Sequence, residues 1–243
     1  MAEGEERQRT REMEAQVFKD RTADIAALLA IPQIAPFFQG LPKNPRLLDL
    51  FTGTGAGAQS VYERLKKLDN KPAGITMVDT FKIEDGRFNR NAPFVFFYPR
   101  KHSSGREETN RNMEELSREC CVDIRKGDAL AYVESNRGGE NGSQLPFDLI
   151  TAFSTELGFL SFDPTKMPKI LSIMRIIYEN GNTPTIFTFG DSYREGMDAL
   201  NSHLIEKCGQ VGWNLYAKPE EVGHPDWDKW ILTNRQLELE RFR

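Results

Sequence analysis

Arg46-Leu-Leu-Asp-Leu-Phe-Thr-Gly-Thr-Gly-Ala-Gly-Ala58 is the stretch of sequence that decides the fold of this chain. Its first half, Leu47–Phe51, predicts a buried β-strand, and three glycines then predict a tight turn into a helix expected over Ala58–Leu68. A strand, a glycine turn and a helix N-terminus together form a place where the backbone approaches a nucleotide closely. Asp49 is the one charged residue in an otherwise apolar strand, and it needs an explanation.

Two kinds of cofactor account for this stretch. Gly53-x-Gly55-x-x-Ala58 satisfies the loose dinucleotide fingerprint, in which a pyrophosphate lies on the helix N-terminus. Asp49-x-Phe51-x-Gly53-x-Gly55 resembles motif I of the class I S-adenosylmethionine (SAM) dependent methyltransferases. The cofactor of that family carries no phosphate and presents an ammonium, which suits a carboxylate at a strand end, directly or through water. Asp49 therefore favours SAM over NAD, and an ordinary strand-to-helix turn in another α/β protein is the third possibility.

Strand and helix patterns alternate along the rest of the chain. Strands are predicted at Leu47–Phe51, Gly74–Val78, Cys121–Ile124, Phe147–Phe153, Thr185–Phe189, Gly212–Ala217 and Lys229–Thr233. Helices are predicted at Ala58–Leu68, Glu107–Glu119, Pro164–Glu179 and Arg194–Cys208. This order predicts a mostly parallel sheet with helices on both faces, and the short loop before the last strand predicts an antiparallel hairpin. The fold class is therefore α/β, a three-layer Rossmann-like sheet of seven strands with a C-terminal hairpin, as the methyltransferase resemblance also implies.

The chain divides into a helical start and one larger domain. Residues 1–45 are predicted to form a helical segment, in which one or two helices over residues 1 to about 30 end at Ile31–Pro36. This segment either caps the cofactor site or covers one side of the sheet. Residues 46–243 form the SAM-binding methyltransferase-like domain. A long insert at 82–117 interrupts this domain, and inserts of this length are usually functional or disordered.

The resemblance to methyltransferases assigns cofactor contacts to the predicted strand ends. Asp79 follows the second strand, where an acid accepts both ribose hydroxyls of SAM or NAD, with a helix cap or turn as the alternative role. Asp128 follows the third strand, where the family binds the adenine amino group, although Gly-Asp turns are also common. The expected cofactor residues are Asp49, Phe51, Gly53, Thr54, Gly55, Asp79, Thr80, Asp128, Ala129, Phe153 and Ser154.

The catalytic residue is harder to predict for methyl transfer. The reaction is an in-line displacement on a carbon activated by a positive sulfur, so alignment supplies most of the rate and only a protonated acceptor needs a base. Glu156 after the fourth strand, and Asp191 and Tyr193 after the fifth, are expected at the ligand edge and are the catalytic candidates. Weaker candidates are Tyr98, His102, His203 and His224.

Composition limits the classes of partner. The chain of 243 residues has 32 Lys and Arg against 36 Asp and Glu, a net charge of −4 that disfavours nucleic-acid binding through a global basic surface. Three cysteines and three scattered histidines lack the spacing of metal ligands, so no metal site is expected. The sequence has no apolar run of membrane-spanning length and no signal-peptide pattern at the start, so a cytoplasmic protein without membrane contact is expected. The sequence does not decide whether the chain forms a homodimer.

The leading hypothesis is a SAM-dependent methyltransferase acting on a small-molecule substrate. The first alternative is an enzyme of the same fold that uses the aminocarboxypropyl arm of SAM, for transfer or internal cyclisation, and releases methylthioadenosine. An RNA methyltransferase using the basic loop around Arg100, Lys101 and Arg106 is less favoured, because the signatures of nucleic-acid amino and cytosine C5 methyltransferases are absent. A non-catalytic partner protein of the same fold and an NAD enzyme also stay open.

Overall fold

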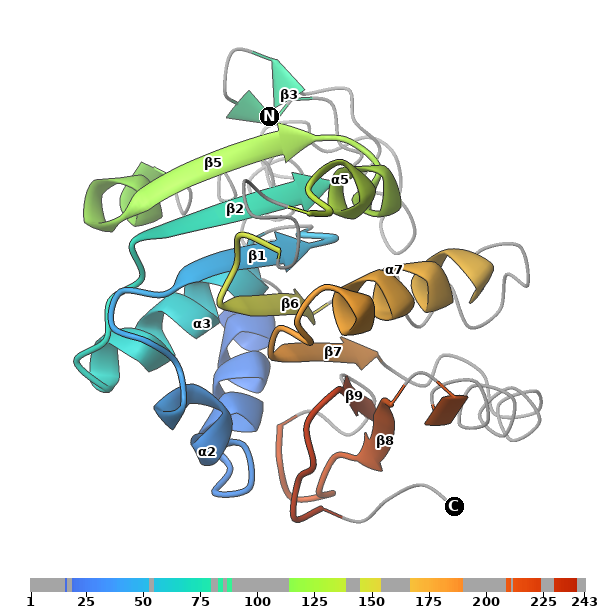
Figure 1. Cartoon of the computed structure of the whole chain (residues 1–243). Coiled ribbons are helices and arrows are strands. Elements are labelled where there is room, and N and C mark those ends of the chain that lie inside the picture. Colours follow the sequence, from blue (N-terminus) through green and yellow to red (C-terminus); the bar gives the residue numbers. More distant parts are fainter. Residues whose placement is uncertain are drawn as a thin grey trace, which may run out of the picture.

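The computed structural model describes residues 16, 19–52, 55–79, 83–84, 87–88, 114–138, 145–153, 167–189, 209–210, 212–223 and 230–239. Within this part of the chain a seven-stranded sheet is packed between helices (Figure 1). Its strands are β1 (Arg46–Leu50), β2 (Gly74–Asp79), β5 (Cys121–Lys126), β6 (Leu149–Phe153), β7 (Thr185–Phe189), β8 (Asn214–Ala217) and β9 (Trp230–Thr233). A two-stranded ribbon, β3 (Ile83–Glu84) with β4 (Arg87–Phe88), lies within the predicted insert.

The sheet has the strand order β5-β2-β1-β6-β7-β9-β8. The first five strands in this order pair in parallel. β9 runs antiparallel to both β7 and β8, so the C-terminal hairpin closes one side of the sheet and β8 points the same way as β7. The Rossmann-like fold with seven strands and a terminal hairpin is therefore confirmed by the order and register of the strands.

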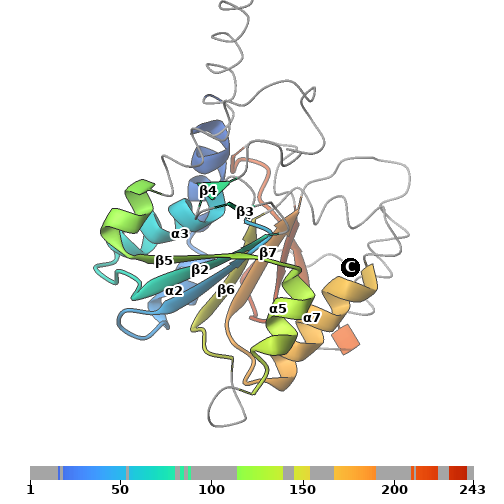
Figure 2. The same cartoon turned by 90° about the horizontal axis from the view of Figure 1, so that it is seen from above.

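Helices cover both faces of the sheet and form three layers (Figure 2). One face carries the helix at 19–30, α2 (Ala35–Gln39), α3 (Ala56–Lys67) and the helix at 114–119, and the other carries α5 (Ala129–Ser135) and α7 (Met167–Glu179). Alternate side chains of β1 enter the two cores, Leu47 on the α3 side, Leu48 and Leu50 on the α7 side.

No helix among the described residues is long and apolar enough to cross a membrane.

Several helices differ from the prediction. α3 begins two residues earlier than predicted, because Gly55 adopts a left-handed φ of 79° and serves as its N-cap. The first helix ends at residue 30, directly before Ile31 as predicted, but Pro36 lies in the first turn of a second helix, α2, where its missing N–H costs nothing. α5 is a helix that the sequence pattern did not predict. The predicted helix Arg194–Cys208 and the first seven residues of Glu107–Glu119 lie outside the described residues.

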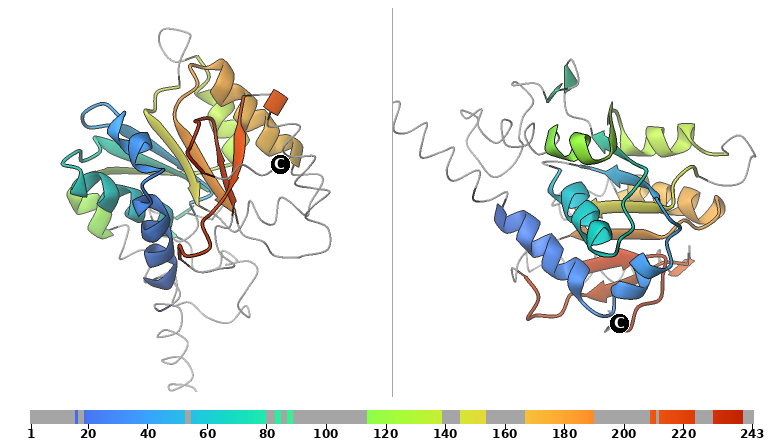
Figure 3. Two further views of the ribbon diagram at one scale, coloured as in Figure 1. Left: turned by 90° about the horizontal axis from the view of Figure 1, so that it is seen from below. Right: turned by 90° about the vertical axis from the view of Figure 1, so that its left-hand side faces the viewer.

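The helix at 19–30 lies beside α3 (Figure 3). The Ser60 hydroxyl of α3 donates a hydrogen bond to the Thr22 carbonyl at 3.2 Å. Three side chains of the helix at 19–30, those of Ile25, Leu28 and Leu29, have no exposed surface and belong to the same core as α3. The helical start is therefore part of the packed domain in the described residues.

A buried ion pair also joins this helix to the segment after β8. Lys218 Nζ lies 3.7 Å from Asp24 Oδ1, and only 3 % and 2 % of the two side chains are exposed. Arg21 Nη1 lies 3.9 Å from the other Asp24 oxygen. Gly223, at φ +64°, leaves room for this carboxylate, since a Cβ there would stand 1.9 Å from Asp24 Oδ1. Because β8 runs parallel to β7, Lys218 lies at the edge of the sheet where the parallel strands end.

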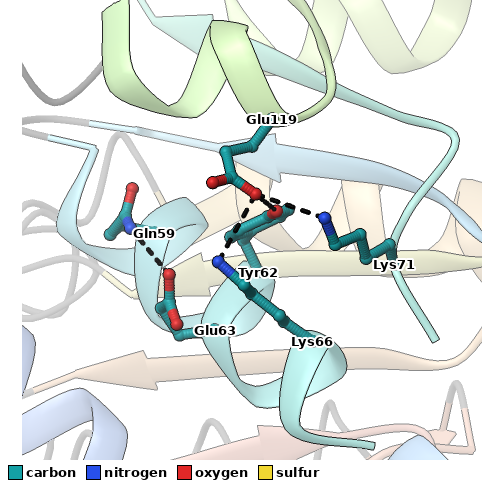
Figure 4. A network of polar contacts seen from close by, with 6 residues as sticks. All are labelled: Gln59, Tyr62, Glu63, Lys66, Lys71 and Glu119. Carbon is teal, nitrogen blue, oxygen red and sulfur yellow. Dashed lines mark hydrogen bonds and ion pairs between the residues drawn. The ribbon is translucent and has the colours of Figure 1, made fainter. Parts of the chain in front are cut away.

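A second polar network lies at the opposite edge, where the strands begin (Figure 4). The buried Tyr62 of α3 donates to Glu119 Oε2 at 2.6 Å, and Lys66 and Lys71 lie 3.4 and 3.3 Å from the same oxygen. The Tyr62 hydrogen bond and the two ammonium groups lower the pKa of Glu119 to about 2. This network anchors α3 to the helix at 114–119 and lies away from the predicted ligand edge.

Candidate functional site

The carboxyl ends of the parallel strands gather the predicted site residues that the structure describes. In open α/β sheets this edge is where ligands bind. Asp79 ends β2 directly beside Lys126, the last residue of β5. Phe153 ends β6, and Asp49 is the fourth of the five residues of β1. Residues that are far apart in the sequence are therefore brought to one edge, as predicted for the strand ends.

Asp49 is a buried carboxyl group inside the sheet. Only 2 % of the residue is exposed, and Thr151 of β6 is its register partner. The Thr151 hydroxyl donates a hydrogen bond of 2.7 Å to Asp49 Oδ1. Burial raises the pKa of Asp49 from 3.8 to about 7, the hydroxyls of Thr151 and Thr52 act in the opposite direction, and the charge of Asp79 raises it further. Asp49 therefore changes its charge near neutral pH.

Asp49 faces the α3 side of the sheet. Its neighbour Leu47 and the Thr151 neighbours Leu149 and Phe153 all belong to the core under α3. Because strand side chains alternate between faces, Asp49 and Thr151 point to that same side. The helix N-terminus that follows the glycine turn thus starts on the face that holds the carboxylate.

The turn after β1 has an unusual backbone conformation. Phe51 has φ 54°, a left-handed value that costs a residue with a side chain about 1–2 kcal/mol. Its ring is half-buried against the core on the α7 side. The amide of Thr52 then donates to the carbonyl of Val78 in β2, and the amide of Gly55 donates to the carbonyl of Thr52. Strain of this kind concentrates at functional sites, and here it lies where the sequence predicts a cofactor.

A glycine allows α3 to lie directly on β6. A Cβ at Gly57 would stand 2.9 Å from Cδ2 of the Phe153 ring, closer than carbon atoms approach without displacement. The third glycine of the motif therefore has a packing role within the helix, and it brings the start of α3 against the end of β6.

Asp79 and Asp128 occupy the two neighbouring strand ends. The backbone carbonyl of Asp79 accepts a hydrogen bond from the Gly127 amide at 2.8 Å, which ties the two turns together. Oδ1 of Asp128 accepts from the amides of Leu130 and Ala131 at 3.0 and 3.1 Å and caps α5. Asp128 thus has a structural role that its Gly-Asp context suggested, and its contact with adenine stays a prediction.

Many predicted site residues lie outside the described residues. These are Gly53, Thr54, Thr80, Ser154, Glu156, Asp191 and Tyr193, together with the weaker candidates Tyr98, His102, His203 and His224 and the basic residues Arg100, Lys101 and Arg106. Their roles stay predictions. Among the residues that the structure does describe, no group of three or more His, Cys, Asp and Glu could hold a metal ion.

Thr151 and Thr52 are the polar residues of this edge that the sequence prediction missed. A signal existed for Thr151, since it is the one polar residue in Leu149–Phe153, as Asp49 is in the predicted strand Leu47–Phe51. The two polar positions become partners only in the register that pairs Asp49 with Thr151. A predicted register between the two strands would have been needed to link them.

Comparisons with known proteins give structural similarity without close sequence similarity. No protein-family model and no curated protein sequence matches this chain. Among solved structures, one from Methanococcus maripaludis assigned as a SAM-dependent methyltransferase has a TM-score of 0.46 and 11% identity, covering 96% of this chain and 93% of that one.

Two further solved structures are similar over part of their length. MNMC2 from Aquifex aeolicus has a TM-score of 0.48 and 16% identity over 86% of this chain, and spermidine synthase from Thermotoga maritima has 0.47 and 11% over 88%. This chain spans 58% and 60% of their lengths. At these scores the similarities are no basis for assigning a ligand or a reaction, and the fold rests on the strand order of the chain itself.

Proposed function

We propose that this chain binds SAM at the carboxyl edge of its sheet and transfers the methyl group to a small-molecule acceptor. The observation that carries the proposal is the buried carboxyl group of Asp49 beside the turn after β1, with Asp79 at the end of the neighbouring strand. The carboxylate of Asp49 suits a ligand with an ammonium and would meet a pyrophosphate as a like charge, whereas Asp79 suits the ribose hydroxyls of either cofactor.

The residues divide between the parts of the cofactor. Asp49 faces the ammonium and Asp79 accepts the ribose hydroxyls, with Thr80 beside it. Asp128 and Ala129 line the adenine, and the turn from Phe51 through Gly53, Thr54 and Gly55 passes close to the amino-acid end. Phe153 and Ser154 lie beside the sulfonium. The positions of Asp49, Asp79 and Phe153 at or near the carboxyl ends of their strands support these assignments.

Bound SAM supplies a methyl carbon activated by its positive sulfur. The chain contributes orientation, because a rigid sheet edge and a strained turn hold the cofactor in one position. Burial of Asp49 and the packing of Phe153 on α3 exclude water from the inner side of the site. For an acceptor that carries a proton, Glu156, Asp191 or Tyr193 is the proposed base.

The helical start completes the site in this proposal. Residues 1–45 cap the cofactor edge, because the helix at 19–30 lies beside α3 and is joined through Asp24 to Lys218, at the edge where the parallel strands end. In this proposal the cap encloses a small acceptor. It also brings the cationic groups of Arg21 and Lys218 to that edge of an acidic chain.

The test is a product assay together with a binding assay. Purified protein is incubated with SAM and pools of small-molecule acceptors, and the adenosine product is identified. S-adenosylhomocysteine is expected. Methylthioadenosine would instead assign the aminocarboxypropyl chemistry. In parallel, thermal shifts with SAM, S-adenosylhomocysteine and NAD are compared, and only the first two are expected to stabilise the protein.

A matched pair of variants separates specific binding from a general charge effect. Asp79→Asn keeps the shape of the side chain at the ribose position and is expected to weaken binding of SAM. Asp123→Asn makes the same change at an exposed position of β5 and leaves binding as in the wild type. Stabilisation by NAD in place of SAM, or none by either, would overturn the proposal.

A further inference from the structure

The hydrogen bond between Thr151 and Asp49 joins the two central strands inside the proposed cofactor site. Both residues are 2 % exposed, and the 2.7 Å distance from Oγ1 to Oδ1 is short. β1 and β6 pair in parallel at this point, so the contact is fixed by the sheet and does not depend on a loop. A hydroxyl that donates to a carboxyl oxygen stabilises its ionised form.

The surroundings of Asp49 offer little else to hold its charge. On β2 its register partner is Met77, and Asp79 lies two residues further on the same face. The elements packed against this face carry further titratable groups among the described residues. These are Tyr62, Glu63, Arg64, Lys66 and Lys67 of α3, Lys19, Asp20, Arg21 and Asp24 of the helix at 19–30, Glu114, Glu115, Arg118 and Glu119 of the helix at 114–119, and Lys126 of β5. Asp79 is the charged group that acts on Asp49, and it opposes ionisation. The hydroxyls of Thr151 and Thr52 therefore carry the stabilisation of the carboxylate.

From this arrangement we infer that Thr151 is a positioning residue that keeps Asp49 ionised and so sets the pH range in which the site accepts the ammonium of its ligand. The inference rests on the proposed function, since it concerns the same site. Thr151 acts on the ligand only through Asp49, whose Oδ1 it holds by the hydrogen bond.

A consequence is that ligand binding is coupled to proton release. A neutral Asp49 offers no charge to an ammonium, so the affinity follows the ionised fraction of Asp49. It rises as the pH rises through about 7 and levels off above this value. A nucleoside without the ammonium gains nothing from the ionised form, and its affinity does not follow this profile.

The experiment measures binding of S-adenosylhomocysteine and of methylthioadenosine by calorimetry between pH 5.5 and pH 8. Both ligands contain adenosine, and only the first carries the ammonium. Thr151→Val keeps the shape of the side chain and removes the hydroxyl, while Thr151→Ser keeps the hydroxyl. Thr185→Val removes a buried hydroxyl from β7, where Thr185 donates to the carbonyl of Thr183, and serves as the matched control.

The expected result is a shift of the binding midpoint of Thr151→Val to higher pH by about one unit, the effect of one hydrogen bond to a charged group. Relative to wild type its affinity for S-adenosylhomocysteine then falls about ninefold at pH 6 and about twofold at pH 8. Thr151→Ser restores the wild-type midpoint and Thr185→Val never moves it. Methylthioadenosine binds all variants equally, which also shows that they are folded.

Two failures have different meanings. In the first, the wild type binds both nucleosides, but Thr151→Val either leaves the pH midpoint of binding unchanged or lowers the affinity for both nucleosides equally. The positioning role of Thr151 is then wrong and the proposed function stands. If the wild type binds neither nucleoside at any pH, the proposed function is wrong, and the inference about Thr151 is overturned with it.

Discussion

Burial of the Asp49 carboxyl group raises its pKa from 3.8 to about 7, and this shift has a consequence for stability. A carboxyl group whose pKa is raised on folding binds its proton more tightly in the folded state. It therefore stabilises the fold fully below its unfolded pKa, and this contribution is lost as the pH rises through the folded pKa. At pH 8 the Asp49 carboxylate is therefore charged, and its contribution to the free energy of unfolding is lower than at pH 5. Such a conflict between function and stability is common at functional sites.

The Asp49→Asn variant removes this dependence, because an amide does not titrate in this range. Relative to wild type, its free energy of unfolding is expected to rise by about 2–3 kcal/mol between pH 5 and pH 8. Urea unfolding at several pH values measures the difference. Asp123→Asn, at an exposed position, controls for the loss of any one carboxylate. Parallel curves for Asp49→Asn and wild type would show that burial does not perturb this group.

The backbone conformation of Phe51 could not be predicted from the local sequence. The other described residues with side chains and a left-handed φ are Asn44, Asp69 and Asn182, types that tolerate this conformation. Phe51 is a bulky residue in the same conformation, at the end of β1. Its sequence pattern was that of a strand residue, and nothing in the local sequence indicates the reversal of φ. Phe51 lies directly after β1, so this conformation belongs to the connection between β1 and α3 and not to the strand.

Among the elements, the helix at 19–30 is held to the hairpin by charges that are out of contact with water. Asp24 and Lys218 lie 3.7 Å apart with 2 % and 3 % of their side chains exposed. A buried ion pair gives little net stability, since the cost of desolvating the two charges offsets their attraction. Removal of one partner is nevertheless destabilising, because the remaining charge stays desolvated without a partner. The pair therefore fixes the position of the helix more than it adds to the free energy of unfolding.

A double-mutant cycle tests this description. Lys218→Met or Asp24→Asn alone is expected to lower the free energy of unfolding by about 3 kcal/mol or more. The double variant is expected to lose less than the sum of the two single variants, with a coupling of about 1–3 kcal/mol. Denaturant unfolding of the four proteins gives the coupling directly. Strictly additive losses would mean that the two charges do not depend on each other.

For the whole molecule, the strands and the longer helices were predictable and the contacts between paired residues were not. All seven strands of the sheet were predicted, because apolar runs such as Leu149–Phe153 are bounded by turn residues. α5 was missed, since seven residues are too short to show helical periodicity and its cap, Asp128, also fits a plain turn. Thr151 was missed because its partner lies 102 residues away in the sequence. Periodicity identifies elements, whereas the site depends on their register.

The helical start raises the question of which residues the fold needs. A division at residue 45 was predicted, with the start either capping the cofactor site or covering one side of the sheet in a domain of residues 46–243. In the structure Ile25, Leu28 and Leu29 are fully buried, and Phe38 is 1 % exposed. They belong to one core with side chains of α3, β8 and β9. Burial of such side chains contributes about 1.5–3 kcal/mol each, so four of them equal most of the net stability of a typical domain.

A chain of residues 46–243 is therefore expected to lack a cooperative unfolding transition and to expose the α3 side of its core. Circular dichroism during urea titration, with binding of a hydrophobic dye, measures both properties against the full chain. Leu28→Ala in the full chain is the graded control and should lower the free energy of unfolding by about 2–5 kcal/mol. If the shortened chain unfolds cooperatively with the stability of the full chain, the start is a detachable cap. If it does not, the helix beside α3 supports the same sheet whose carboxyl edge carries Asp49, and folding and ligand binding depend on one core.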